Sequence, residues 1–350
     1  MNLRKSAIFT VALLILTTTT VNSFAESKSD SDQKGANNAN VWSEEKNPTD
    51  FWAKPNKNVS NSQDQKDLEN QSPKYSGLTV VPAEVFSARN TATATCISTS
   101  CGSGDLTNHG GSMLPTVTIY SIYWGSATVL SNIYKNNTDN FLKGLVCASA
   151  SCNTTLTNTL QQYWTGGKNT SISFGRNFTD TSAAPSSAPS TSTIANEVVK
   201  VVKAAGQTFD PNGLYLVFTD RYPSRAGYCA WHSAAKVRIS RTTTASFAFG
   251  YMPSLLTATT SCGAHYLPGY TPSQLGEGLD SLFNVTTHEL YEAMTDSLIS
   301  GNAWYDAAGY ENGDKCAWNW ATPLTMNWSG TNYRFVVQQE YSNATHACAA

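Results

Sequence analysis

The stretch LYLVFT at residues 214–219 decides the fold class of this 350-residue chain. Its six apolar, aromatic or β-branched residues follow one another without the polar alternation of a strand that has one wet face. An unbroken run of this kind is typical of a strand buried on both faces of its sheet. We therefore expect this strand to lie inside a layered structure, with other elements covering both faces.

Predicted strands and helices alternate on either side of this stretch. Runs rich in β-branched and aromatic residues, such as TVTIYSIYW at 116–124, predict strands, and apolar residues at helical spacing predict helices. The predicted strands are 116–124, 171–178, 214–219, 245–252 and 333–341, and the predicted helices are 127–145, 156–164, 194–205 and 274–298. The alternation predicts a single α/β domain at 78–350, with helices packed against a mixed β-sheet.

A secretory signal peptide is predicted at residues 1–25. Arg4 and Lys5 supply the positive start, residues 7–16 form a short apolar run, and cleavage is expected after Ala25. The run is too short for the alternative of an uncleaved membrane anchor. No later segment holds about 18 consecutive apolar residues, so we expect no stable membrane insertion after cleavage.

Charge is scarce in the predicted domain and concentrated outside it. Only 14% of all residues are charged, with 23 Lys and Arg against 25 Asp and Glu. This balance gives no basic surface for nucleic acid. Residues 26–77 are polar and of low complexity, and they hold nine acidic and seven basic residues. A segment with so few apolar residues cannot offset the entropy of ordering, so we predict a disordered tail there.

Eight cysteines all follow the predicted tail. They are Cys96, Cys101, Cys147, Cys152, Cys229, Cys262, Cys316 and Cys348. An even number of cysteines in an exported chain predicts disulfides. We therefore expect a secreted protein, located in the periplasm or outside the cell. The shared C-x4-C spacing favours Cys96 with Cys101 and Cys147 with Cys152, which leaves Cys229 with Cys262 and Cys316 with Cys348 as the longer bridges. Eight cysteines allow 105 pairings, so this pairing is a preference.

The stretch VTTHELYEAMTDSLISGNAWYDAAGYENGDKCAW at 285–318 carries the most chemistry. His288, Glu292 and Asp296 are four residues apart in a predicted helix, so they share one face. An imidazole and two carboxylates on one stripe repel or desolvate one another unless a cation joins them. The predicted metal ligands here and in the loop that follows are His288, Glu292, Asp296, Asp306, Glu311 and Asp314.

Glu289 follows His288 directly, where the H-E-x-x-H zinc proteases place a general base. The second histidine of that motif is replaced by Glu292, so the pattern is H-E-x-x-E. An alternative interpretation is an amphipathic surface helix with solvated acids. A single histidine with carboxylates suits zinc with an open position, whereas an oxygen-rich set suits calcium.

His232 and Asp220 follow the buried stretch at 214–219. Active-site groups of α/β sheets gather at the carboxyl ends of strands, so both residues are placed where a site would form. We predict His232 as an additional ligand or acid/base group. The alternative is a structural histidine beside the disulfide of Cys229.

The chain resembles bacterial relatives of the phosphate-induced, EXORDIUM-like family of secreted proteins. The resemblance covers about 116–348 and rests on TVTIYSIYWG, LYLVFTD, GYCAWHS, SCGAHY, LDSLFNVTTHELYEAMTD, WYD and ENGDKCAW. It implies export, an α/β core and the cysteine positions, but the family has no settled enzymatic activity. Plant members lack the His-Glu pair, so only relatives that carry it match His288, Glu289 and the five carboxylates downstream.

Two functions remain open from the sequence. The first is an exported metal-dependent hydrolase of the zinc-peptidase type, with Glu289 as general base and a peptide as substrate. The second is a non-enzymatic, EXORDIUM-like binding protein, in which a structural calcium ion supports contact with an extracellular or cell-surface glycan or protein.

Overall fold

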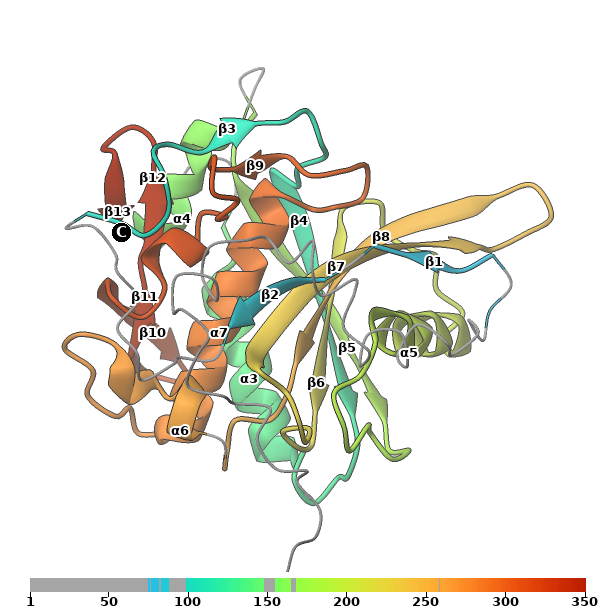
Figure 1. Cartoon of the computed structure of the whole chain (residues 1–350). Coiled ribbons are helices and arrows are strands. Elements are labelled where there is room, and N and C mark those ends of the chain that lie inside the picture. The colour runs from blue at the N-terminus through green and yellow to red at the C-terminus, as the bar shows by residue number, and fades with distance from the viewer. Residues whose placement is uncertain are drawn as a thin grey trace, which may run out of the picture. The chain divides into compact units, whose positions relative to one another are not determined.

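A mixed β-sheet with helices on both faces organises the structure (Figure 1). The computed structural model describes residues 75, 77–81, 83–87, 99–147, 155–164, 168–257 and 259–350. All of these belong to one compact unit, Glu45–Ala350. The predicted signal peptide at 1–25 and the predicted tail at 26–77, apart from Tyr75 and Gly77, lie outside the described residues.

Seven strands form the sheet in the order β1-β7-β8-β6-β4-β5, and β2 also pairs with β7. Their bounds are β1 Thr79–Val80, β2 Glu84–Ser87, β4 Thr116–Trp124, β5 Ser171–Asp180, β6 Gly213–Thr219, β7 Tyr228–Arg238 and β8 Thr244–Met252. Neighbouring strands run parallel from β5 through β4 and β6 to β8, whereas β7 is antiparallel to its neighbours. The predicted α/β fold with a mixed sheet is confirmed.

Strand β6 contains the stretch LYLVFT, and all seven of its residues are buried. Successive side chains of a strand point to opposite faces, so an unbroken apolar run serves two cores. Leu214, Leu216 and Phe218 enter one core, and Tyr215 and Val217 enter the other. Helix α5 (Thr191–Ala204) lies on the second face, and α3 (Asn132–Gly144) and α7 (Glu277–Thr295) lie on the first (Figure 1).

Helix α7 is buried almost all round. It packs against β7 and β8 of the sheet on one side and against β11 of a separate hairpin on the other. That hairpin consists of β10 (Ala321–Trp328) and β11 (Thr331–Gln338). Every residue from Leu279 to Thr295 in this helix is buried, so the alternative of a surface helix with solvated acids is wrong.

The remaining elements are short. They are β3 Thr107–Asn108, α4 Thr155–Thr159, η2 Leu160–Tyr163, α6 Thr259–Cys262, η3 Ala264–Tyr266, β9 Trp304–Tyr305, η4 Asp314–Cys316, β12 Glu340–Ser342 and β13 Ala347–Ala349. The predicted strand at 333–341 is divided between β11 and β12, and neither joins the main sheet. Strand β7 was not predicted, although its register against β2 and β8 proves central to the site.

Two disulfides confirm the predicted long bridges, Cys229–Cys262 and Cys316–Cys348. Cys101 and Cys147 are also disulfide-bonded, whereas Cys96 and Cys152 lie outside the described residues. The pairing agrees with an oxidising compartment. Among the helices of the described ranges, none is long and apolar enough to span a membrane.

Candidate metal centre

Helix α7 and the loop after it bring one group of three ligands together. His288 Nε2 lies 3.0 Å from Glu292 Oε2, as expected for residues one turn apart, and 3.8 Å from Asp314 Oδ1. The backbone N–H of Asp314 donates to Glu292 Oε1 at 2.9 Å, which fixes the loop against the helix. These three side chains offer ligand atoms that are all within 4.8 Å of one another.

Strand β7 brings His232 to the same place from the opposite side of Glu292. His232 Nδ1 lies 3.9 Å from Glu292 Oε2, and His232 Nε2 lies 3.9 Å from Glu311 Oε1. His232, Glu292 and Glu311 form a second group of three ligand atoms within 4.8 Å, and all three residues are buried. A buried group of one histidine and two glutamates can hold a metal ion.

The ring of His232 contacts two further acceptors. Its Nδ1 lies 3.0 Å from Glu289 Oε2, and its Nε2 lies 3.2 Å from the backbone oxygen of Asp296. Glu289 thus contacts the histidine of β7, and it follows His288 directly on α7. The prediction that His232 belongs to the site is supported by this geometry, but its position differs from the one expected. It lies inside β7, and not at the carboxyl end of β6.

Burial and mutual repulsion dominate the electrostatics of the cluster. Burial, followed by the charges of neighbouring carboxylates, raises the pKa of Glu292, Glu311 and Asp314 well above the usual range. Burial also raises the pKa of Asp296 to about 8. Burial lowers the pKa of His232 and His288. Without a cation, the fold therefore favours the neutral forms of all these groups, and a bound divalent ion would reverse that preference for the carboxyls.

Two acidic residues of the cluster were missed by the sequence analysis. Glu84 in β2 is the register partner of His232 in β7, and its charge contributes to the raised pKa of Glu311 and Asp296 after the effect of burial. Glu340 in β12 is fully buried, and burial followed by the charge of Glu292 raises its pKa.

Gln338 at the end of β11 contacts His288 at Nδ1, the ring nitrogen that does not face the carboxylates. Its side-chain nitrogen lies 2.8 Å from His288 Nδ1 and donates to the backbone oxygen of Gly313 at 3.0 Å. It therefore joins the histidine of the helix to the loop that carries Asp314. Gly313 itself packs tightly here, because a Cβ at this position would lie 2.7 Å from His288 Nδ1.

Asp306 does not belong to either ligand group. It forms a fully buried ion pair with Lys315, at 2.9 Å from Nζ to Oδ2. It also accepts backbone N–H groups of Ser103 at 2.6 Å and of Ala308 and Tyr310 at 2.9 Å. We remove Asp306 from the predicted ligand set, because its oxygens already hold the loop that precedes Asp314.

Asp296 and Asp220 are also placed outside the two groups. Asp296 ends α7, where its backbone N–H donates to the oxygen of Glu292, and its own backbone oxygen contacts His232. Its carboxyl group therefore influences the cluster by charge. Asp220 pairs with Arg221 at 2.8 Å and accepts the N–H of Ser126, at the ends of β6 and β4. It does not meet His232.

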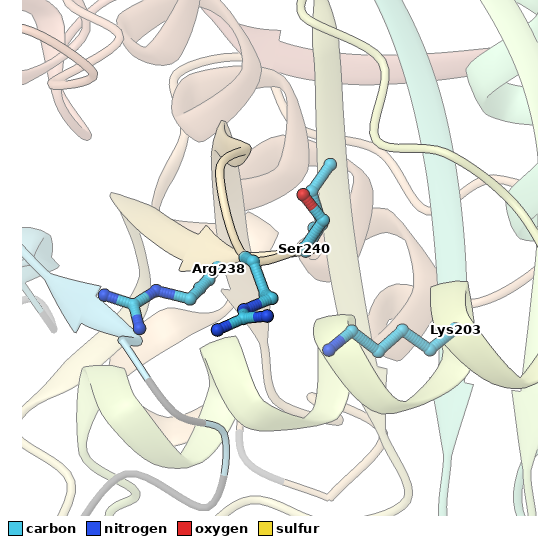
Figure 2. Close-up of a pocket in the computed structure, with 5 residues that line it drawn as sticks. Lys203, Arg238 and Ser240 are labelled. Atoms are coloured by element: carbon cyan, nitrogen blue, oxygen red, sulfur yellow. The ribbon is translucent and has the colours of Figure 1, made fainter.

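A separate surface hollow has the opposite charge. It is lined by Lys203 of α5 and by residues 238–241, where β7 ends, among them Arg238 and Arg241 (Figure 2). Its cationic side chains repel metal ions, so we do not assign it to the same centre.

Comparison with family models, with curated proteins and with solved structures finds no match to this chain. The resemblance to EXORDIUM-like proteins therefore stays a prediction, and the chemistry must be argued from the site itself.

The raised pKa values of the buried carboxyls predict a pH effect on the metal-free protein. The folded state keeps protons that the unfolded state has lost, so unfolding releases protons and rising pH favours it. The histidines, with lowered pKa, act in the opposite direction only below about pH 6.5. We expect the Tm of the chelated protein to fall between about pH 6.5 and about pH 8.5 and saturating divalent cation to remove most of the fall. Scanning calorimetry tests this, and a metal-free Tm that rises over this interval would contradict it.

Two of the predicted loop ligands, Asp306 and Asp314, should respond differently to the same substitution. Asp306→Asn leaves the Lys315 charge buried without its partner, so we expect about 3–5 kcal/mol lower stability but unchanged metal content. Asp314→Asn removes a ligand, so we expect weaker metal binding and no loss of stability in the metal-free state. Urea unfolding and elemental analysis measure both effects, and loss of metal in a folded Asp306→Asn variant would restore Asp306 as a ligand.

Proposed function

We propose that this protein is an exported metal-dependent hydrolase of the zinc-peptidase type. The observation that carries the proposal is the convergence of His288, Glu292 and Asp314, with Glu289, the residue after His288, held in place by His232. One imidazole and two carboxylates are three protein ligands, the number that catalytic zinc sites use while a fourth position stays open for water.

Asp314 gives this ligand group a side that faces solvent. Its side chain is 25% exposed, whereas those of His288 and Glu292 are 0% and 1% exposed. A substrate bond can approach a site only from a face that water reaches, so Asp314 marks the direction of approach. The buried side, formed by α7 and β11, holds the other two ligands in place.

Glu289 is suited to the role of general base. A zinc ion lowers the pKa of a bound water toward about 7, and a carboxylate at hydrogen-bond reach can then accept its proton. Glu289 is fully buried, and His232 holds its Oε2 at 3.0 Å, so the carboxylate has one fixed orientation. Its Oε2 contacts His232 Nδ1, which in turn lies 3.9 Å from Glu292 Oε2.

The general-base role predicts that binding and hydrolysis separate. In Glu289→Gln we expect full metal content and a loss of peptide hydrolysis of about 10²–10⁴-fold, because proton transfer to a positioned base contributes that much. In His288→Ala we expect both metal and hydrolysis to be lost. Elemental analysis and cleavage of an unfolded protein substrate are the measurements.

Glu277→Gln is the matched control, because it makes the same change on the same helix but at its partly exposed first turn, where Glu277 pairs with His265. It should keep both metal and hydrolysis. Full hydrolysis by Glu289→Gln would remove Glu289 from the general-base role, and full metal content in His288→Ala would remove His288 from the ligands.

A second candidate function is an EXORDIUM-like binding protein with a structural calcium ion and an extracellular glycan or protein partner. The complete burial of His232, Glu292 and Glu311 favours it, because a closed site has no position for a substrate. The oxygen-rich surroundings of that group also suit calcium.

The calcium alternative predicts a selective stabilisation. At about 100 times its dissociation constant, a ligand that binds only the folded state adds about 2.7 kcal/mol to stability. If the second function holds, calcium restores the Tm of chelated protein, zinc does not, and no peptide is cleaved. Recovery by zinc together with cleavage would contradict it.

A further inference from the structure

Glu292 belongs to both ligand groups of the site. We propose that the centre holds two divalent cations, with Glu292 as the ligand they share. The first cation position is formed by His288 and Asp314, and the second by His232 and Glu311. This deepens the proposed function and rests on it for the role of the first position, but the number of bound ions can be measured without any activity.

The two histidines approach Glu292 from different elements. His288 Nε2, on α7, lies 3.0 Å from Glu292 Oε2. His232, on β7, offers a ring nitrogen that lies within 4.8 Å of ligand oxygens of Glu292 and Glu311. Each histidine also has a carboxylate of its own, at 3.8 Å for Asp314 and 3.9 Å for Glu311. One ion would use one of these sets, and the other set would remain buried with no function.

Glu311 provides an independent sign of a ligand at the second position. Its Oε1 is buried and receives no hydrogen bond from the residues that the structure describes. Its distance of 3.9 Å from His232 Nε2 is too long for a hydrogen bond. Two ligands of one metal ion, each about 2.1 Å from it, are separated by about 3–4 Å, so this spacing suits an ion between them.

The surroundings of His232 match those of a metal-binding histidine. Such a histidine presents one nitrogen to the metal and donates the other N–H to a carboxylate, which fixes its ring. Glu289 Oε2 lies 3.0 Å from Nδ1, which leaves Nε2 to face Glu311. The backbone oxygen of Asp296, at 3.2 Å from Nε2, adds a further oxygen donor at the same position.

Charge balance also favours two ions. Within the described ranges, no lysine or arginine lies at ion-pair distance from Glu292, Asp296, Glu311 or Asp314. Glu84, Glu289 and Glu340 lie around these four. A single divalent ion compensates two ionised carboxylates, so a second ion would let more of these buried carboxyls ionise without an uncompensated charge.

The test counts manganese ions on chelated, refilled full-length protein. We expect two Mn²⁺ per chain by calorimetry and elemental analysis. Two manganese ions in one centre lie about 3.5–4 Å apart, so the electron paramagnetic resonance spectrum should show exchange coupling. Glu311→Gln and Asp314→Asn should each bind one Mn²⁺ and lose the coupling, and Glu292→Gln should bind neither ion tightly. Glu277→Gln, outside the centre, should still bind two.

Each outcome separates this inference from the proposed function. One Mn²⁺ in the wild type, unchanged in Glu311→Gln, would overturn the second position, and peptide hydrolysis by that protein would leave the hydrolase proposal intact. Two coupled ions without any hydrolysis would support the two-cation centre and contradict the hydrolase. No bound ion would overturn both. The coupled spectrum is measured on the wild type, so the test holds even where a variant does not fold.

Discussion

The burial of like charges around Glu292 is the constraint on which this site depends. Helix α7 lies between the sheet and the hairpin β10–β11, so its polar side chains cannot turn to solvent. An uncompensated carboxylate in such a place is costly, and several together are more so. Burial accordingly raises the pKa of Glu292 and Glu311 and lowers the pKa of His232 and His288. The raised values belong to carboxyls that would need a compensating cation to ionise, and the lowered values keep the histidines neutral, which is the form that binds metal.

The framework around the cluster is held by interactions that need no metal. The buried pair of Asp306 and Lys315 holds the loop before Asp314, and the disulfide Cys316–Cys348 holds the chain after it. On the sheet side, Cys229–Cys262 anchors the start of β7, three residues before His232. Because these contacts fix the ligands beforehand, little ordering remains to oppose metal binding. We therefore expect the Asp306–Lys315 pair to determine the stability of this loop, and the neighbouring Asp314 to determine the affinity for metal.

The sequence predicts the local parts of this site better than the long-range ones. The run LYLVFT and the spacing of His288 and Glu292 act through fixed strand and helix periods, so they could be predicted without tertiary information. Glu84 and Glu340 reach the site only because their strands pair or pack with elements that are distant in the sequence. No local sequence pattern predicts such contacts. The placement of Asp306 outside both ligand groups could not be predicted for the same reason, because its pairing with Lys315 depends on the burial of both side chains. His232 was selected for its residue type, but it was expected after the buried stretch 214–219 and lies within β7. That strand was not predicted, because its buried polar residues interrupt the apolar pattern of a strand.

The contacts of His232 link the two cation positions to the chemistry of Glu289. In the metal-free geometry, both ring nitrogens face acceptors, the Glu289 carboxyl and the Asp296 backbone oxygen. A carbonyl oxygen can only accept, so either the ring carries two protons or Glu289 carries one. The lowered pKa of buried His232 opposes the doubly protonated ring. A cation at Nε2 would remove this conflict, because a neutral ring then donates Nδ1–H to an ionised Glu289. In the two-cation arrangement, the second ion would therefore keep Glu289 in the ionised form that a general base requires.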